Sequence, residues 1–157
     1  MSNYLTVEEA NEYVSTHYIS TDTLRTSWES LSDADKEVLL TSSTEAINMI
    51  PWPGKKAVPS QPNAFPRWPD TEVPVAIVAA CVENALSMTD STVSEETNLY
   101  KKMWAYGLSS YSIGNFSETI VQGGGTGGVT TLAQSGIVSV KAQTILGPFL
   151  GGGFTIE

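Results

Sequence analysis

Few residues in this chain could support catalysis. The 157-residue sequence has one histidine, His17, and one cysteine, Cys81. Ser-His-Asp or Cys-His chemistry would need His17 as its base, and the sequence shows no structured neighbourhood for it. Cys81 lies in an apolar run, which is typical of a buried small hydrophobe rather than a reactive thiol. We therefore predict that the protein is not an enzyme.

Two further patterns could bind a metal ion or a nucleotide, but both lack essential parts. Asp33, Asp35 and Glu37 alternate without the glycine and terminal glutamate of a calcium loop. The G-x-G-x-x-G match at 123–128 lies in a glycine run, with no acidic residue about 20 positions later. We expect no cofactor and no metal, and we interpret the acidic trio as a solvated helix start.

The most unusual stretch is the loop at 51–73, which opens with "PWPGKKAVPSQPNAFPRWPD". Six of the eight prolines and two of the four tryptophans fall in its first twenty residues. Proline fixes φ and lowers the entropy lost when a loop becomes ordered. The loop also contains the aromatic and cationic side chains that could bind single-stranded DNA, namely Trp52, Phe65, Trp68, Lys55, Lys56 and Arg67.

The charge distribution opposes DNA binding. The net charge is −9, and residues 1–50 hold nine acidic against two basic residues. Nucleic-acid binding normally needs a basic footprint, and only the loop has a small one. An acidic protein can still stand beside DNA and repel it. The carboxylates that could form such a DNA-repelling surface are Glu8, Glu9, Glu12, Asp33, Asp35 and Glu37. The alternative is that they are simply solvated at the protein surface.

Hydrophobic spacing predicts a mainly α protein, a small bundle of about four helices. The expected helices cover 7–17, 21–31, 33–50 and 74–89, and a further short helix could cover 94–104. Thr6 and Glu9 form a capping box, and Ser32 can cap the third helix. The fourth helix is apolar nearly all round, with Glu83 and Asn84 as its main polar breaks, so we expect it at the centre. We assign residues 1–106, including the loop, to one helical domain.

Residues 107–157 have a different character, rich in glycine, serine and β-branched residues. Strands are predicted in 110–121, 129–132 and 136–141. After Glu118 the only charges are Lys141 and Glu157. An apolar tail that is left exposed to water is prone to aggregate. We therefore predict an extended, strand-containing arm that another chain covers. The alternative is a poorly ordered, linker-like end.

The sequence also bears on location. Residues 1–20 carry three glutamates and no apolar core of a signal peptide. No apolar run approaches the ~20 residues that cross a membrane. We expect an intracellular protein, or one assembled inside a cell.

Several motifs occur in an order that resembles a known family. "YLTVEEANEYV" (4–14) is followed by "STEAINMIPWPGKK" (43–56), "QPNAFPRWPD" (61–70) and "VPVAIVAACVENAL" (73–86). This order resembles the head–tail connector (adaptor) proteins of tailed bacteriophages, a group also catalogued as DnaT-like single-stranded-DNA-binding proteins. "IGNFSETIV" (113–121) and "ILGPFL" (145–150) resemble its later part more loosely. No glycine follows Arg67, where one is usual, and Gly123–Gly128 looks like an insertion.

The resemblance implies a subunit of a homo-oligomeric ring, a dodecamer, at the neck of a virion assembled in the host cytoplasm. The ring joins the portal protein to a stopper or tail completion protein, and DNA passes through its channel without specific binding. No membrane is involved. The alternative function is a single-stranded-DNA-binding module that uses the loop. We expect subunit contacts at Trp52, Phe65, Arg67, Trp68, Leu146, Pro148, Phe149, Leu150 and Phe154. The alternative for the loop is that it packs on its own bundle.

Overall fold

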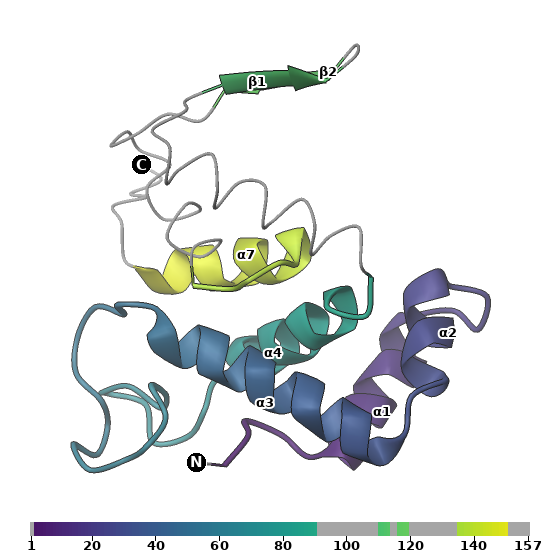
Figure 1. Ribbon diagram of the computed structural model, residues 1–157. Coiled ribbons are helices and arrows are strands. Elements are labelled where there is room, and N and C mark those ends of the chain that lie inside the picture. Colours follow the sequence, from purple (N-terminus) through teal and green to yellow (C-terminus); the bar gives the residue numbers. More distant parts are fainter. Residues whose placement is uncertain (1, 91–109, 114–115, 120–134, 151–157) are drawn as a thin grey trace.

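The chain is mainly helical, as predicted. The computed structural model describes residues 2–90, 110–113, 116–119 and 135–150. These residues form the helices α1 (Val7–His17), α2 (Thr23–Glu29), α3 (Asp33–Met49), α4 (Val75–Ser87) and α7 (Val140–Leu146), and the 3₁₀ turn η1 (Gly147–Leu150) (Figure 1). Strands β1 (Ser110–Ile113) and β2 (Phe116–Thr119) pair antiparallel as a hairpin. The predicted helix at 94–104 and strand at 129–132 lie outside the described residues.

Local capping explains where the helices begin. In α1 the Glu9 amide donates to Thr6 Oγ1 at 3.2 Å, and the Thr6 amide donates to Glu9 Oε2 at 2.8 Å. These two bonds complete the predicted capping box and satisfy two backbone donors that the helix leaves free. Ser32 caps α3 as predicted. Helix α2 is capped by Asp22 rather than by one of the threonines beside it.

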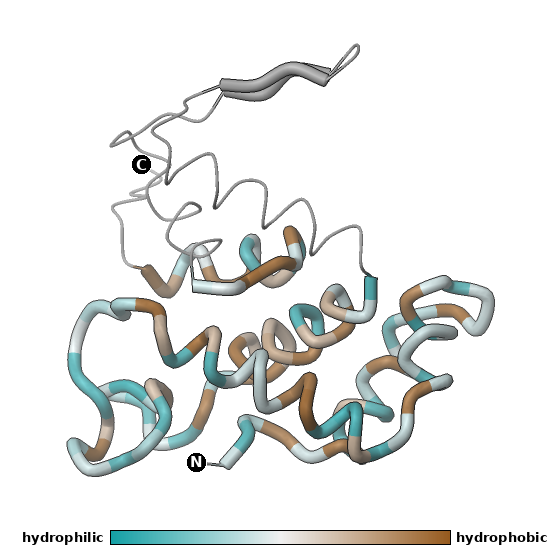
Figure 2. The backbone as a smooth tube through the Cα atoms, viewed as in Figure 1, coloured by the Kyte–Doolittle hydropathy of each residue, from teal (hydrophilic) through white to brown (hydrophobic). Residues whose placement is uncertain are grey.

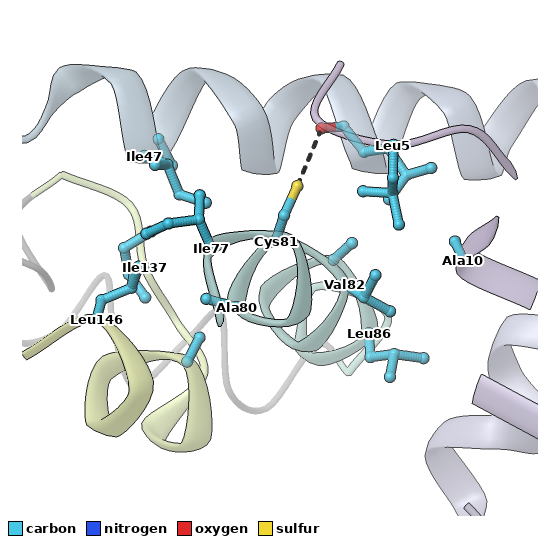
Figure 3. Packing of buried hydrophobic residues seen from close by; sticks show 14 of the residues in the cluster. Leu5, Ala10, Ile47, Ile77, Ala80, Cys81, Val82, Leu86, Ile137 and Leu146 are labelled. Carbon is cyan, nitrogen blue, oxygen red and sulfur yellow. Dashed lines mark hydrogen bonds between the residues drawn. The ribbon is translucent and has the colours of Figure 1, made fainter. Parts of the chain in front are cut away.

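Helix α4 is the centre of the bundle. It packs against α3 on one side and α7 on the other, and it also contacts α1 and α2. Hydrophobic residues follow each other along most of its length (Figure 2). Figure 3 shows the side chains that meet around it, with Ile47 of α3, Ile77 of α4 and Leu146 of α7 on one flank. All three are fully buried, which explains why so apolar a helix is stable here.

The C-terminal segment corrects one prediction. Residues 136–141 do not form a strand: a turn leads into α7, and the Ser139 side chain accepts a hydrogen bond from the Ala142 amide at 3.1 Å. Ala142 and Leu146 lie one helical turn apart and are both fully buried. The expectation of an extended arm covered by another chain is therefore wrong for residues 135–150, because these residues complete the hydrophobic core of their own subunit.

Asn84 of α4 provides the polar contacts that fix this segment. Its side-chain oxygen accepts hydrogen bonds from the amides of Val138 (2.8 Å) and Ser139 (3.3 Å). Its side-chain nitrogen donates to the Gly136 carbonyl at 3.4 Å. Backbone groups that leave water need such partners, so this amide sets the path by which the chain returns to the bundle.

Glu83, the neighbouring residue, is a buried carboxylate with three donors. Its side chain is 2% exposed and lies 2.7 Å from the Lys141 ammonium of α7. The Tyr13 hydroxyl donates to it at 2.7 Å, and the Tyr18 hydroxyl donates to its other oxygen. Burial, and then the hydrogen bonds to Glu83, raise the pKa of both tyrosines. The charge is thereby compensated, as a buried carboxylate requires.

Neither a membrane-spanning helix nor a cluster of metal ligands occurs in the described residues. None of their helices has the length and apolar character to cross a bilayer, and none of their acidic, histidine and cysteine side chains cluster as metal ligands do. His17 stacks on the Tyr13 ring with 3.9 Å between ring centroids. Cys81 is buried, as predicted, and this burial raises the pKa of its thiol.

Replacing Leu146 tests whether α7 belongs to its own subunit. We expect Leu146→Ala to lower the free energy of unfolding of the isolated chain by about 2–5 kcal/mol, because it removes a fully buried side chain. Chemical denaturation measures this change. Val140→Ala is the matched control on the exposed face of the same helix, with 76% of the valine exposed. Equal stability of the two variants would contradict the docked position of α7.

High pH should destabilise the bundle. Burial raises the pKa of Tyr4 to about 12 from its ordinary value of 10.0, and the pKa values of Tyr13 and Tyr18 are also raised. The folded state therefore favours the neutral phenols, and their contribution to stability is complete below pH 10 and is lost as the pH rises toward 12. Denaturation curves across this range should show the loss. A flat profile would contradict it.

Candidate interface at the proline-rich loop

The loop between α3 and α4 folds back on itself. An isolated antiparallel bridge pairs Lys56 with Arg67. The Ala57 amide donates to the Pro66 carbonyl, and the Trp68 amide donates to the Lys55 carbonyl, each at 3.0 Å. The Phe65–Pro66 and Trp68–Pro69 peptide bonds are cis. The two limbs of the loop therefore run side by side and hold Trp68 next to Lys55.

Arg67 is the centre of the loop's hydrogen bonding. Its guanidinium donates to four backbone carbonyls, those of Trp52 (3.3 Å), Pro53 (2.9 Å), Gly54 (2.6 Å) and Ala64 (3.2 Å). Gly54 has φ 79°, a conformation that other residues rarely adopt. The planar fork of Arg67 is therefore used inside its own loop.

Three amide side chains hold the loop in place, Gln61 within the loop and the Asn48–Asn63 pair between the loop and α3, and sequence reasoning did not single them out for this role. Gln61 accepts from the Val58 amide (3.0 Å) and donates to the Pro66 carbonyl (2.8 Å). Asn48 of α3 donates to Asn63 at 3.0 Å. The position of Gln61 within the proline run was a usable signal, because a residue that bonds two loop limbs must be a donor and an acceptor at once.

The aromatic residues of the loop divide into buried and exposed. Trp52 is 8% exposed, and its ring nitrogen donates to the Ile47 carbonyl at 2.7 Å. Phe65 packs edge-on against Trp52 (centroids 5.0 Å apart) and against Phe149 of η1 (5.8 Å). Trp68 is 74% exposed. The structure therefore separates two tryptophans that looked equivalent in the sequence.

The predicted contact residues of the C-terminal segment are mostly used internally. Leu146 is fully buried in the subunit's own core, which contradicts its assignment to a subunit contact. Phe149 and Leu150 are partly buried against the same core. Pro148 is exposed, and Phe154 lies outside the described residues. Of the predicted contact residues that the structure describes, Trp68 and Pro148 are the exposed ones.

Exposed apolar side chains occur on the loop and at the two helix ends that border it. They are Met49 (74% exposed), Val58 (54%), Trp68 (74%) and Val75 (85%). Lys55 of the loop, whose carbonyl bonds the Trp68 amide, is exposed as well. Burial of such side chains, aided by one cation, is the chemistry of a protein–protein contact. We call these five residues the loop surface.

Replacing Arg67 tests the internal role of its guanidinium. We expect Arg67→Lys to lower the free energy of unfolding by roughly 1–3 kcal/mol, because one ammonium cannot satisfy four carbonyls that converge on a planar fork. Thermal denaturation measures the difference. Lys55→Met, at an exposed site in the same loop, should leave stability unchanged. If Arg67→Lys is equally harmless, the carbonyl cluster does not stabilise the loop.

Comparison with known proteins places the chain at the level of family. A family model described as "Putative DnaT-like ssDNA binding protein" matches residues 2–156. Neither the curated proteins nor the solved structures gave a match. Because the family model spans nearly the whole sequence, the chain belongs to this DnaT-like family.

Proposed function

We propose that the chain is a structural subunit that assembles through its loop surface, as a head–tail connector of a tailed bacteriophage. One observation supports this most directly: a loop whose backbone is held by Arg67 and Gln61 presents Trp68 to solvent at 74% exposure. A tryptophan contributes more to association than almost any other side chain. A loop that is already ordered loses less entropy when it binds.

The distribution of charge supports a role beside DNA rather than on it. The chain carries a net charge of −9, and a wall of like charge lets DNA pass without holding it. In the proposed assembly, copies of the chain form a ring, a dodecamer by the resemblance, that joins a portal protein to a stopper or tail completion protein. This role belongs to the neck of a virion and requires no catalytic group.

A second candidate function is binding of single-stranded DNA, which the description of the family favours. The exposed Trp68 beside Lys55 could stack on one base and contact one phosphate. The other predicted stacking residues, Trp52 and Phe65, are buried, and Arg67 is engaged with carbonyls. Within the residues that the structure describes, one stacking platform and one free cation give a weaker site than those of proteins that bind strands tightly, so we rank this function second.

Trp68→Ala should separate assembly from folding. We expect this variant to keep the thermal stability of the unaltered chain, because the side chain is mostly exposed, and to assemble less readily. Sedimentation velocity over a range of protein concentrations measures assembly. Trp52→Ala is the matched control and should lose stability, since that ring is buried and hydrogen-bonded. Unchanged assembly of Trp68→Ala would contradict the proposed role of the loop surface.

A mobility-shift assay with single-stranded DNA at moderate salt decides between the two functions. The structural function predicts no tight complex. Tight binding that Trp68→Ala and Lys55→Glu both abolish would establish the second function instead.

A further inference from the structure

An acidic groove runs along the N-terminal segment beside α3, with its carboxylates near the first turns of that helix. It has a volume of about 770 Å³ and runs between the N-terminal segment, the first turn of α1 and the start of α3. Four carboxylates line it, those of Glu8, Glu9, Asp33 and Glu37, and no lysine or arginine does. Tyr4 and Val7 supply part of its apolar wall. The groove therefore suits a partner that carries both a cation and apolar surface.

Two of the four carboxylates form no side-chain bond within the part of the subunit that the structure describes. Glu9 completes the capping box, and Asp33 lies 3.7 Å from the Lys36 ammonium. Glu8 and Glu37 are exposed, and neither side chain has a hydrogen bond or an ion pair to the rest of the described chain. These two are the groups that an incoming cation would meet.

The loop surface carries the matching cation. In the described part of the chain, each other lysine or arginine has a partner within the subunit: Arg25 with Glu29, Lys36 with Asp33, Lys56 with the Gln61 carbonyl, Arg67 with four carbonyls and Lys141 with Glu83. Lys55 is exposed beside Trp68, and its ammonium has no such partner there. The loop surface thus combines one available cation with apolar side chains.

The carboxylates of the groove and Lys55 lie toward opposite ends of α3, so a single copy cannot bring the opposite charges together. Helix α3 spans 17 residues, about 25 Å at 1.5 Å per residue. The groove residues Asp33 and Glu37 belong to its first turns, and the loop follows its last turn (Figure 1). Ser2 and Tyr4, at the other end of the groove, bond to the loop. Contact between two different patches on identical chains is heterologous, and it repeats from copy to copy until the rotation closes a ring.

We infer that the loop surface of one copy docks into the acidic groove of a second copy, with Lys55 facing Glu8 and Glu37. The inference rests on the proposed assembly function and names the two faces of the contact. Its occupant is another copy of this chain, because the complementary charge and apolar surface are both present on the same molecule. Both faces are exposed to solvent, so the contact should weaken as ionic strength rises.

Charge reversal tests this pairing. Lys55→Glu and Glu37→Lys should each weaken self-association roughly 5- to 30-fold, since each replaces attraction by repulsion. The double variant should recover most of the loss. Glu45→Lys, at an exposed site of α3 outside the groove, is the control for net charge and should keep the original association. Light scattering across a range of protein concentrations measures the self-association of these four variants against that of the unaltered chain.

Cross-linking gives a second readout that does not need a stable ring. A variant with Lys55→Cys and Glu37→Cys should, on oxidation, form a ladder of covalent species beyond the dimer, because each copy has two different faces. Lys55→Cys with Glu45→Cys should not, and the native Cys81 is buried.

The outcomes distinguish this inference from the proposed function. If charge reversal and cross-linking have no effect while Trp68→Ala still impairs assembly, the groove is not the partner of the loop, and the inference is overturned alone. Covalent dimers without higher species would also overturn it, since they indicate a two-fold contact. Absence of both self-association and the ladder in the unaltered and cysteine proteins overturns the inference and the assembly function together.

Discussion

Two adjacent polar residues on the most apolar helix determine which segments of this molecule are joined to that helix. Glu83 and Asn84 are almost fully buried on α4, where unpartnered polar groups would be strongly destabilising. Glu83 is bonded to Tyr13, Tyr18 and Lys141, and Asn84 to the backbone of 136–139. Each bond joins α4 to a segment distant in sequence. Hydrophobic burial gives the bundle its stability, while these two side chains define which segments lie against which faces of α4.

This arrangement determines which surfaces remain for other molecules. If residues 135–150 were extended, their apolar side chains would be exposed and could bind other chains. In the structure these residues complete the hydrophobic core of their own subunit. The same core takes in Trp52 and Phe65, and Phe149 packs on the Phe65 ring. Among the large apolar side chains that are exposed in the described residues, Met49, Val58, Trp68 and Val75 lie at the loop and the helix ends beside it, with Trp68 as the largest, whereas Ile19, Val38 and Val140 lie elsewhere. In the proposed assembly, the contact therefore involves the loop rather than residues 135–150.

The sequence predicted the helices well because their signals are local. The capping box at Thr6, the cap at Ser32 and the apolar periodicity of α3 and α4 all concern residues a few positions apart. Helix α7 was missed because its surroundings are rich in β-branched residues, which favour strands. Ser139 as a cap, with Ala142 and Leu146 one turn apart, was the competing signal.

The loop could be recognised from its composition, but its internal chemistry could not. Arg67 meets four carbonyls only because the chain turns at Gly54 and returns beside itself at Pro66. The burial of Trp52 and the exposure of Trp68 follow from that path, since the two residues have similar neighbours in sequence. Position in space, rather than residue type, decides which aromatic side chain is available to a partner.

Amide hydrogen exchange of the dilute, unassembled chain tests most directly whether the C-terminal segment belongs to its own subunit. The account predicts that the amides of 142–146 are protected in the monomer to a degree similar to those in the middle of α4, because both lie in one hydrogen-bonded core. It also predicts that assembly changes protection at the loop and not in α7. Rapid exchange throughout 140–146 in the monomer, with protection gained only on assembly, would contradict it.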